Sequence, residues 1–240
     1  MKAFVQKHSF VWPILGSLLI WVFIGLVSGQ FGVGTFFSAA KLATFSLLLG
    51  LAQMIVVTSG DGAIDLSQIY ILTLSAYVSC NLMGTNIFLG LLAAVAVGML
   101  CGLANGCIDV FLHIPAMITT LASGYIIFTV ILILAPHMKT LPNSDFVSFI
   151  NKNLGGFSML TVIAIVVAAL LAVLLYRTQY GKQLHAVGQN RIASGYSGIA
   201  VGRVVIIAFV LAGGISGLAG ALCGDYRIKR GGIAVRPLLL

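Results

Sequence analysis

The sequence predicts an all-α polytopic membrane protein, and three observations predict this fold class. Hydrophobic residues occupy 60% of the 240 positions and charged residues only 8%, against roughly 45–50% and 25% in soluble domains. The apolar residues form continuous runs, unlike the alternating pattern of membrane β-strands. Since a spanning helix needs about 20 apolar residues, the length accommodates about six to eight spans and no sizeable soluble domain.

Apolar runs without a charged residue indicate a bundle of about seven transmembrane helices. The runs cover residues 10–28, 42–57, 69–83, 87–108, 116–135, 159–176 and 204–222. The second and third are short, and the Gly- and Asp-containing segment 58–67 separates them. Lys2 and Lys7 before the first run and small residues at 27–29 would also suit a signal peptide. We expect the first run to remain as an uncleaved span, because it is long.

The positions of Lys and Arg predict a cytoplasmic amino terminus, because positively charged loops stay on the cytoplasmic side. This orientation places six basic residues inside, namely Lys2, Lys7, Arg177, Lys182, Arg191 and Arg203. It places Lys41, Lys139 and Lys152 outside, and also the basic residues of the tail 223–240, which the rule disfavours. The net charge of +8 suits anionic lipid headgroups, and we expect no nucleic-acid partner.

No linker or repeat divides the chain, so we treat residues 1–222 as one transmembrane domain followed by the aberrant tail 223–240. Within the polar stretch 136–158, Phe146, Phe149 and Ile150 have the spacing of a short helix on the membrane surface. An interfacial anchor is the favoured interpretation, and an extracellular lid is the other.

Segment 58–67 holds two of the five acidic residues, Asp61 and Asp65, between two apolar runs. Gly60 and Gly62 would supply unusual backbone angles, and the Asp65 carboxylate would cap the helix that follows. Backbone without helix survives at membrane depth only where protein buries it or it lines a cavity. Two interpretations remain open: a broken or re-entrant element beside a translocation path, or an ordinary cytoplasmic turn.

An intramembrane aspartyl protease is a remote alternative, in which Asp61 or Asp65 pairs with Asp225 as a catalytic dyad. Neither the His nor the Cys residues have metal-ligand spacing. A phosphate loop ending at Lys182 would need Gly where Tyr176 stands and Ser or Thr where Gln183 stands. We therefore expect no metal and no cofactor bound by this chain.

Small residues recur every fourth position in two runs, at Gly98, Gly102 and Gly106 and at Gly213 and Gly217. Such spacing lets helices approach closely. Packing inside the bundle or at an interface between two subunits accounts for it and says nothing about function.

The predicted cytoplasmic loop 177–203 is too long for a simple turn. It carries four basic residues and no acidic one. Asn190 is expected to cap a short helix through Arg191 and Tyr196, which Gly195 and Gly198 would end or kink. Docking onto an acidic cleft of a soluble partner and binding to lipid headgroups both remain open.

Three motifs occur in order within residues 40–222. Gly-Ala-Ile-Asp-Leu-Ser occupies 62–67, and Asn-Gly at 105–106 precedes Ile-Pro-Ala-Met-Ile-Thr-Thr-Leu at 114–121. The third motif lies within 180–199 and ends in Ser-Gly-Ile. Together they resemble permease subunits of bacterial ATP-binding-cassette importers for simple sugars, of the ribose, xylose, galactose and autoinducer-2 type. Ala63 and Ala122 replace family glycines, and the family continues with further helices, so we expect this chain to be truncated at its carboxyl end.

The resemblance implies a multi-pass protein of the bacterial inner membrane that is not itself an enzyme. Its partners would be a cytoplasmic ATPase that binds ATP-Mg, a second permease subunit and a periplasmic sugar-binding protein. Residues implied in ATPase coupling are Tyr180, Gly181, Lys182, Gly188, Asn190, Arg191, Ala193, Ser197 and Gly198. Candidates for the substrate path are Asp61, Asp65, Ser67, Tyr77, Asn81, Asn105 and Tyr125. A truncated, non-transporting membrane scaffold is the alternative.

Overall fold

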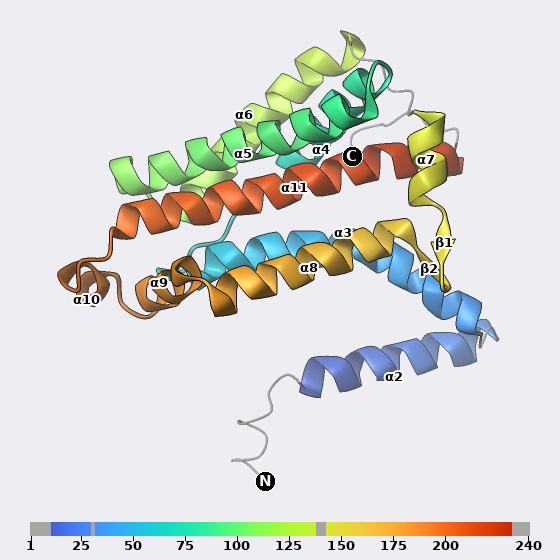
Figure 1. Cartoon of the computed structure of the whole chain (residues 1–240), viewed down its shortest axis with the longest axis horizontal. Coiled ribbons are helices and arrows are strands. Elements are labelled where there is room, and N and C mark those ends of the chain that lie inside the picture. Colours follow the sequence, from blue (N-terminus) through green and yellow to red (C-terminus); the bar gives the residue numbers. More distant parts are fainter. Residues whose placement is uncertain (1–10, 30–31, 138–142, 232–240) are drawn as a thin grey trace. The chain divides into compact units, whose positions relative to one another are not determined.

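The computed structural model describes residues 11–29, 32–137 and 143–231, which fold almost entirely into helices (Figure 1). The helices are α2 (Val11–Ser28), α3 (Val33–Thr58), α4 (Gln68–Met83), α5 (Ile87–Leu112), α6 (Ala116–Leu134), α7 (Ser144–Ile150), α8 (Met159–Arg177), α9 (Gln179–Gln189), α10 (Arg191–Tyr196) and α11 (Val201–Gly231). A 3₁₀ turn, η1 (Ala135–His137), follows α6. Strands β1 (Asn153–Leu154) and β2 (Phe157–Ser158) form a small antiparallel hairpin.

Each predicted apolar run is helical, which confirms the all-α class. Among the described residues, five helices are long and apolar enough to cross a membrane: α3, α5, α6, α8 and α11. The apolar helices α2 and α4 are shorter. Segment 59–67 lies between α3 and α4 without helix, so the predicted break is also present.

Helix α3 is longer than the sequence suggested, with 26 residues from Val33. The predicted run, 42–57, began only after Lys41, on the assumption that a charged residue lies outside a span. Instead, Lys41 Nζ donates a hydrogen bond of 2.6 Å to Asn151 Oδ1. The helix therefore continues through this residue, because a partner from the β1 side of the chain accepts from the ammonium group.

The chain divides into two compact units, Met1–Ala40 and Lys41–Leu240. The first contains α2 and the start of α3, and the second contains all later elements. The boundary at residue 222 of the predicted domain falls inside α11, which runs on to Gly231. Residues 232–240 of the predicted tail lie outside the described residues.

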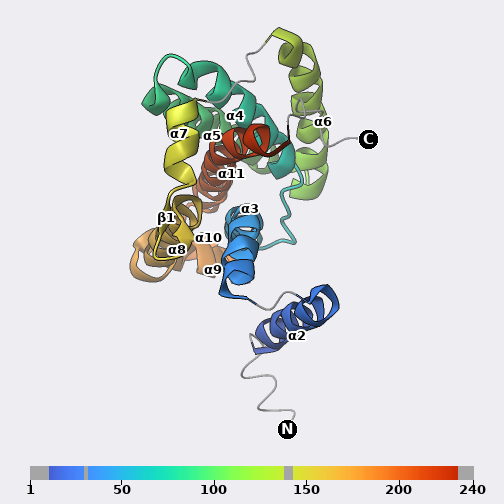
Figure 2. The same cartoon turned by 90° about the vertical axis from the view of Figure 1, so that its right-hand side faces the viewer.

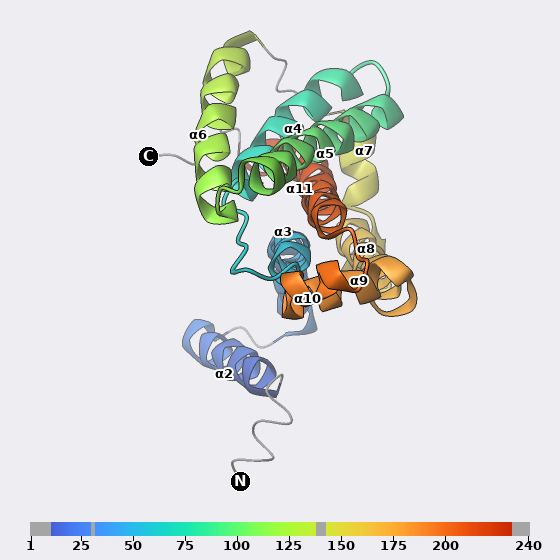
Figure 3. The ribbon, with the colours of Figure 1, turned by 90° about the vertical axis from the view of Figure 1, so that its left-hand side faces the viewer.

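Helix α11 packs against α4 and α5 in the second unit (Figures 2 and 3). The glycine spacing explains this packing: a β-carbon added to Gly98 would lie 2.9 Å from the α-carbon of Gly217, and one on Gly102 would meet the Phe209 carbonyl oxygen. Phe209 itself is fully buried. These small residues therefore allow α5 and α11 of the same chain to pack closely.

The short helix predicted around Phe146 exists as α7, and Asn143 caps it by accepting hydrogen bonds from Asp145 N and Phe146 N. Its apolar face does not lie on a membrane surface, however. Phe146 and Ile150 are buried in the main apolar core, while Phe149 is exposed. The spacing predicted the helix correctly but not the surface it covers.

Candidate functional site

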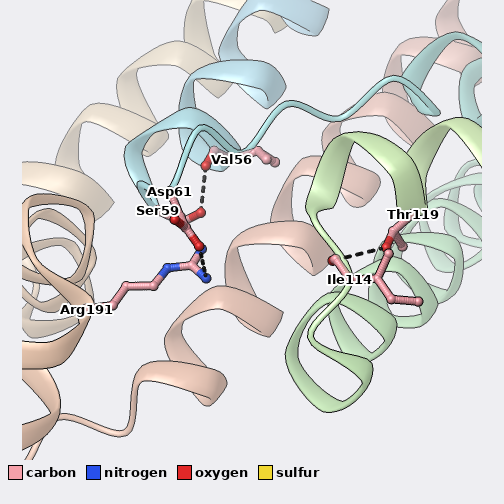
Figure 4. A network of polar contacts seen from close by, with 6 residues as sticks. All are labelled: Val56, Ser59, Asp61, Ile114, Thr119 and Arg191. Carbon is pink, nitrogen blue, oxygen red and sulfur yellow. Dashed lines mark hydrogen bonds and ion pairs between the residues drawn. The ribbon is translucent and has the colours of Figure 1, made fainter.

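The break after α3 is a tight turn followed by a non-helical segment in which every second side chain is buried. Gly60, Asp61 and Gly62 have φ angles of 79°, 61° and 65°, in the left-handed region that favours glycine. The two glycines were predicted to take this role, and Asp61 joins them. Ser59 Oγ donates to the Val56 carbonyl oxygen at 2.7 Å and completes the end of α3 (Figure 4).

Alternate residues in the second half of the break are buried in the protein. Ala63, Asp65 and Ser67 are each at most 4% exposed. Thr120 Oγ1 of α6 accepts a hydrogen bond from Leu66 N at 3.0 Å. The Gln53 side-chain amide, oriented to satisfy both of its ends, pairs with the backbone N–H and C=O of Asp65 at 3.2 Å each. Non-helical backbone is thus supported by α3 and α6, as a membrane interior requires.

A buried hydrogen-bond network starts at the Asp65 carboxylate. Oδ1 accepts from Ser67 N at 2.9 Å and from Ser67 Oγ at 2.6 Å. Asn105 Nδ2 of α5 donates to the same Ser67 Oγ at 2.8 Å. The expectation that Asp65 caps α4 is wrong in detail, because Ser67 is the N-cap residue and Asp65 holds it in place. Three predicted path residues are therefore linked, because Asp65 and Asn105 both form hydrogen bonds with Ser67.

The other predicted path residues lie apart from this network. Tyr77 packs with Ile127 and Ile131 in a smaller apolar cluster. Asn81 lies one turn further along α4 and is partly buried. Tyr125 of α6 is 58% exposed, with its ring centroid 6.2 Å from that of Tyr70. The rotation of each helix turns these side chains to different surroundings, which the residue types alone do not predict.

The motif at 114–121 shapes the start of α6. Thr119 Oγ1 donates to the Ile114 carbonyl oxygen at 3.4 Å (Figure 4). Thr120 Oγ1 lies 2.8 Å from the Ala116 carbonyl oxygen and 3.2 Å from that of Ile64. One threonine thus closes the first turn of α6 and the next holds the extended segment.

Segment 177–203 forms two short helices beside the ends of α8 and α11 (Figures 1 and 3). Asn190 caps α10 by accepting from Ala193 N at 2.9 Å, and Gly198 has a φ of 82°, so both predictions are confirmed. Helix α9 was not predicted. Its N-cap is Thr178, whose hydroxyl oxygen accepts from Gly181 N at 3.2 Å.

Close backbone contacts seat α9 on the spanning helices. A β-carbon on Gly188 would collide with the Thr58 carbonyl oxygen, and one on Gly181 with that of Leu175. Tyr180 Oη donates to the Val204 carbonyl oxygen at 3.2 Å, and burial raises the pKa of this phenol. These three predicted coupling residues act on the chain's own backbone.

A different set of side chains faces outward. Ile192 is 74% and Tyr196 is 91% exposed, and Lys182, Ala193 and Ser197 are exposed as well. Arg191 does not share this direction: its side chain is 28% exposed, and Nη1 lies 3.3 Å from Asp61 Oδ2 (Figure 4). Segment 177–203 therefore has one surface against the bundle and another open to a partner.

A cavity of about 420 Å³ opens where α10, the turn at Asp61 and the ends of α5 and α11 meet. Its polar lining residues are Asp61, Asp109, His113 and Arg191. Asp109 was not among the predicted site residues, because the fourth apolar run stops at residue 108, whereas α5 continues to Leu112. An acid four residues after Asn105, and hence on the same helix face, was the signal.

The described residues contain no group of three or more His, Cys, Asp or Glu side chains able to hold a metal. Asp225, the proposed protease partner, lies in the part of α11 whose side chains are outside the described residues. The carboxylate of Asp65 is engaged with Ser67. What the site offers is a buried polar contact between helices and an exposed surface at one end of the bundle.

Comparison with known proteins gives a family match over residues 15–229, to the branched-chain amino acid transport system / permease component. The chain is 27% identical to the D-allose transport system permease protein AlsC of Escherichia coli (strain K12), over 90% of this chain and 69% of that protein. It is 28% identical to the fructose import permease protein FrcC of Rhizobium meliloti, over 93% and 66%.

A further relative is the galactose/methyl galactoside import permease protein MglC of Salmonella typhimurium, with 27% identity over 92% of this chain and 74% of that protein. The chain thus spans about two thirds to three quarters of the length of these relatives. No solved structure matches it.

Proposed function

This chain belongs to the family of branched-chain amino acid transport system permease components, and from this premise we propose that it is the membrane-spanning subunit of an ATP-binding-cassette importer. In this proposal it carries a simple sugar across the bacterial inner membrane by alternating access. The observation that supports it best is the match to sugar import permeases over at least 90% of this chain. The chain has no catalytic role, and a partner hydrolyses ATP.

The proposed docking surface for the ATPase is the outward side of segment 177–203. An apolar pair, Ile192 and Tyr196, is exposed on a short capped helix, and Lys182 adds positive charge. Exposed aromatic and aliphatic side chains within a polar rim are typical of protein interfaces. Lipid headgroups would bind the charge but would not require a helix held by the backbone contacts of Gly181 and Gly188.

Orientation follows from this assignment. Helices α3, α5 and α8 end, and α11 begins, on the side of α9 and α10, because residues from these ends line one cavity or contact α9. We propose that this side faces the cytoplasm, as the basic residues Arg177, Lys182, Arg191 and Arg203 favour, and the cytoplasmic amino terminus stays a prediction from Lys2 and Lys7. A periplasmic binding protein would then deliver the sugar to the opposite side, and a second permease subunit would complete the path.

The substrate is proposed from the relatives, whose names specify D-allose, fructose and galactose. The family description names branched-chain amino acids, and competition experiments separate the two classes. Asp65, Ser67 and Asn105 are proposed to brace the path, because Asp65 Oδ1, Ser67 Oγ and Asn105 Nδ2 pair with one another. Asp65 Oδ2 and Asn105 Oδ1 have no hydrogen-bond partner among the described residues. Tyr77, Asn81 and Tyr125 remain predicted sugar contacts.

The test is uptake of labelled D-allose, fructose and galactose by cells that express the chain with the ATPase and binding protein encoded beside it, with leucine and galactose as competitors. Purification of the complex reports docking separately. Ile192→Glu should lose the ATPase and uptake together, while Lys152→Glu, an exposed change after α7, should lose neither.

Two outcomes would contradict the proposal. Docking without uptake of any sugar would favour the scaffold alternative. An unchanged complex in Ile192→Glu would reassign segment 177–203 to the lipid surface.

A further inference from the structure

Arg191 is the only predicted coupling residue that forms an ion pair within the described part of the chain, and it forms it with the turn at the start of the buried segment. It belongs to α10, yet its side chain points toward the bundle (Figure 4). Asp61 is 74% exposed, and an ion pair with so exposed a partner contributes little on its own. Some other group has to account for the inward direction of the guanidinium.

Asp109 is that group. It is 9% exposed, and its Oδ2 has no hydrogen-bond partner among the described residues. The Nε of Arg191 is likewise buried and unpaired there. Both residues line the same cavity, whose lining contains no other Lys or Arg. A buried carboxylate without a nearby cation is strongly disfavoured, so we expect Arg191 to matter more to Asp109 than to the exposed Asp61.

Asp61 and Asp109 each lie close in the sequence to one part of the buried hydrogen-bond network formed by Asp65, Ser67 and Asn105. Asp61 precedes the segment that carries Asp65 and Ser67, and Asp109 lies four residues after Asn105 on the same face of α5. Arg191 pairs with Asp61 and shares the cavity with Asp109, so it lies near both segments that hold the hydrogen bond from Asn105 to Ser67.

We propose that Arg191 is a positioning residue that fastens α10 to Asp61 and Asp109, so that a displacement of α10 is passed to segment 59–67 and to α5 together. The agent that displaces α10, a docked ATPase, rests on the proposed function; the fastening itself does not. The cavity supplies room for the guanidinium to move closer to Asp109 when α10 shifts.

Hydrogen–deuterium exchange of the full chain in lipid nanodiscs tests the fastening without any partner. Arg191→Met should speed exchange in peptides covering 58–67 and 105–113 by at least about tenfold, because it leaves the buried Asp109 without its cation. Asp61→Asn should change the same peptides by no more than about fivefold, as expected for an exposed pair. Arg191→Lys should restore part of the protection, and Lys182→Met, which removes an exposed cation from α9, should change neither peptide.

Faster exchange confined to residues 190–198 in Arg191→Met would overturn the proposal, as would equal effects of Asp61→Asn and Arg191→Met. Uptake assays then report the consequence for transport: Arg191→Met should keep the ATPase bound but lower uptake per ATP hydrolysed. If no ATPase binds even the unaltered chain, the proposed function fails while the exchange result still stands.

Discussion

The side-chain amide nitrogen of Asn105 donates a hydrogen bond of 2.8 Å to Ser67 Oγ, and both atoms are buried. The two residues belong to two motifs that lie far apart in the sequence, one in the non-helical segment and one in α5. This contact explains why a chain that interrupts its helices still holds one arrangement. The break is fixed from outside, by a neighbouring helix, because its own backbone forms no ladder of hydrogen bonds.

Removal of the Asp65 carboxylate should loosen this arrangement. Asp65→Ala leaves the Ser67 hydroxyl and N–H without their acceptor, a loss of about 1–3 kcal/mol for buried groups. Asp65→Asn keeps an oxygen at Oδ1 and should cost less. Thermal unfolding in detergent measures both, with the exposed Asp145→Asn of α7 as the control. Equal losses for Asn and Ala would mean that the charge, and not the acceptor, is what matters.

The packing of α9 against the end of α3 depends on Gly188, a position that tolerates no side chain. Gly188→Ala would push a methyl group into the Thr58 carbonyl oxygen, a backbone atom that cannot turn aside. We expect this variant to lose ATPase binding and about 1–3 kcal/mol of stability, as for other overpacked contacts.

Gly195→Ala is the matched control, seven residues along the same segment, because a β-carbon there meets nothing within 4 Å. It should bind and unfold like the unaltered chain. Normal binding by Gly188→Ala would show that α9 can leave the end of α3 without consequence for docking.

Local patterns predicted most of the helices and the break, because apolar runs, glycines and Asn190 act on their own neighbourhood. Contacts between distant segments escaped prediction. Helix α3 passes Lys41 because Asn151 is placed to accept from it, and Arg191 turns inward because Asp61 and Asp109 lie beneath it. A basic residue on a loop looks the same in the sequence whether it faces a partner or its own core.

The interface between α5 and α11 should be equally sensitive to the size of the side chain at Gly102. Gly102→Ala would place a methyl group on the Phe209 carbonyl oxygen and within 3.2 Å of the Val210 α-carbon. Forcing the helices apart is expected to cost about 1–3 kcal/mol. Gly50→Ala in α3 meets nothing within 4 Å and should be neutral or slightly stabilising, because alanine favours helix by about 1 kcal/mol. Thermal unfolding in detergent compares the two, and equal midpoints would contradict the close packing of this interface.

Tyr180 should make stability depend on pH in the alkaline range. Burial raises the pKa of its phenol above the ordinary value of 10.0, so the folded state favours the protonated form. The contribution of the buried phenol to the free energy of unfolding is fully present below pH 10 and is lost as the pH rises further, since unfolding then releases a proton.

Tyr180→Phe also loses the hydrogen bond to the Val204 carbonyl oxygen, worth about 1 kcal/mol. The unaltered chain should therefore be the more stable one near neutral pH, and its advantage over Tyr180→Phe should shrink above pH 10. Unfolding midpoints of both chains across this range measure the difference, and a constant gap would show that the phenol is hydrated in the folded protein.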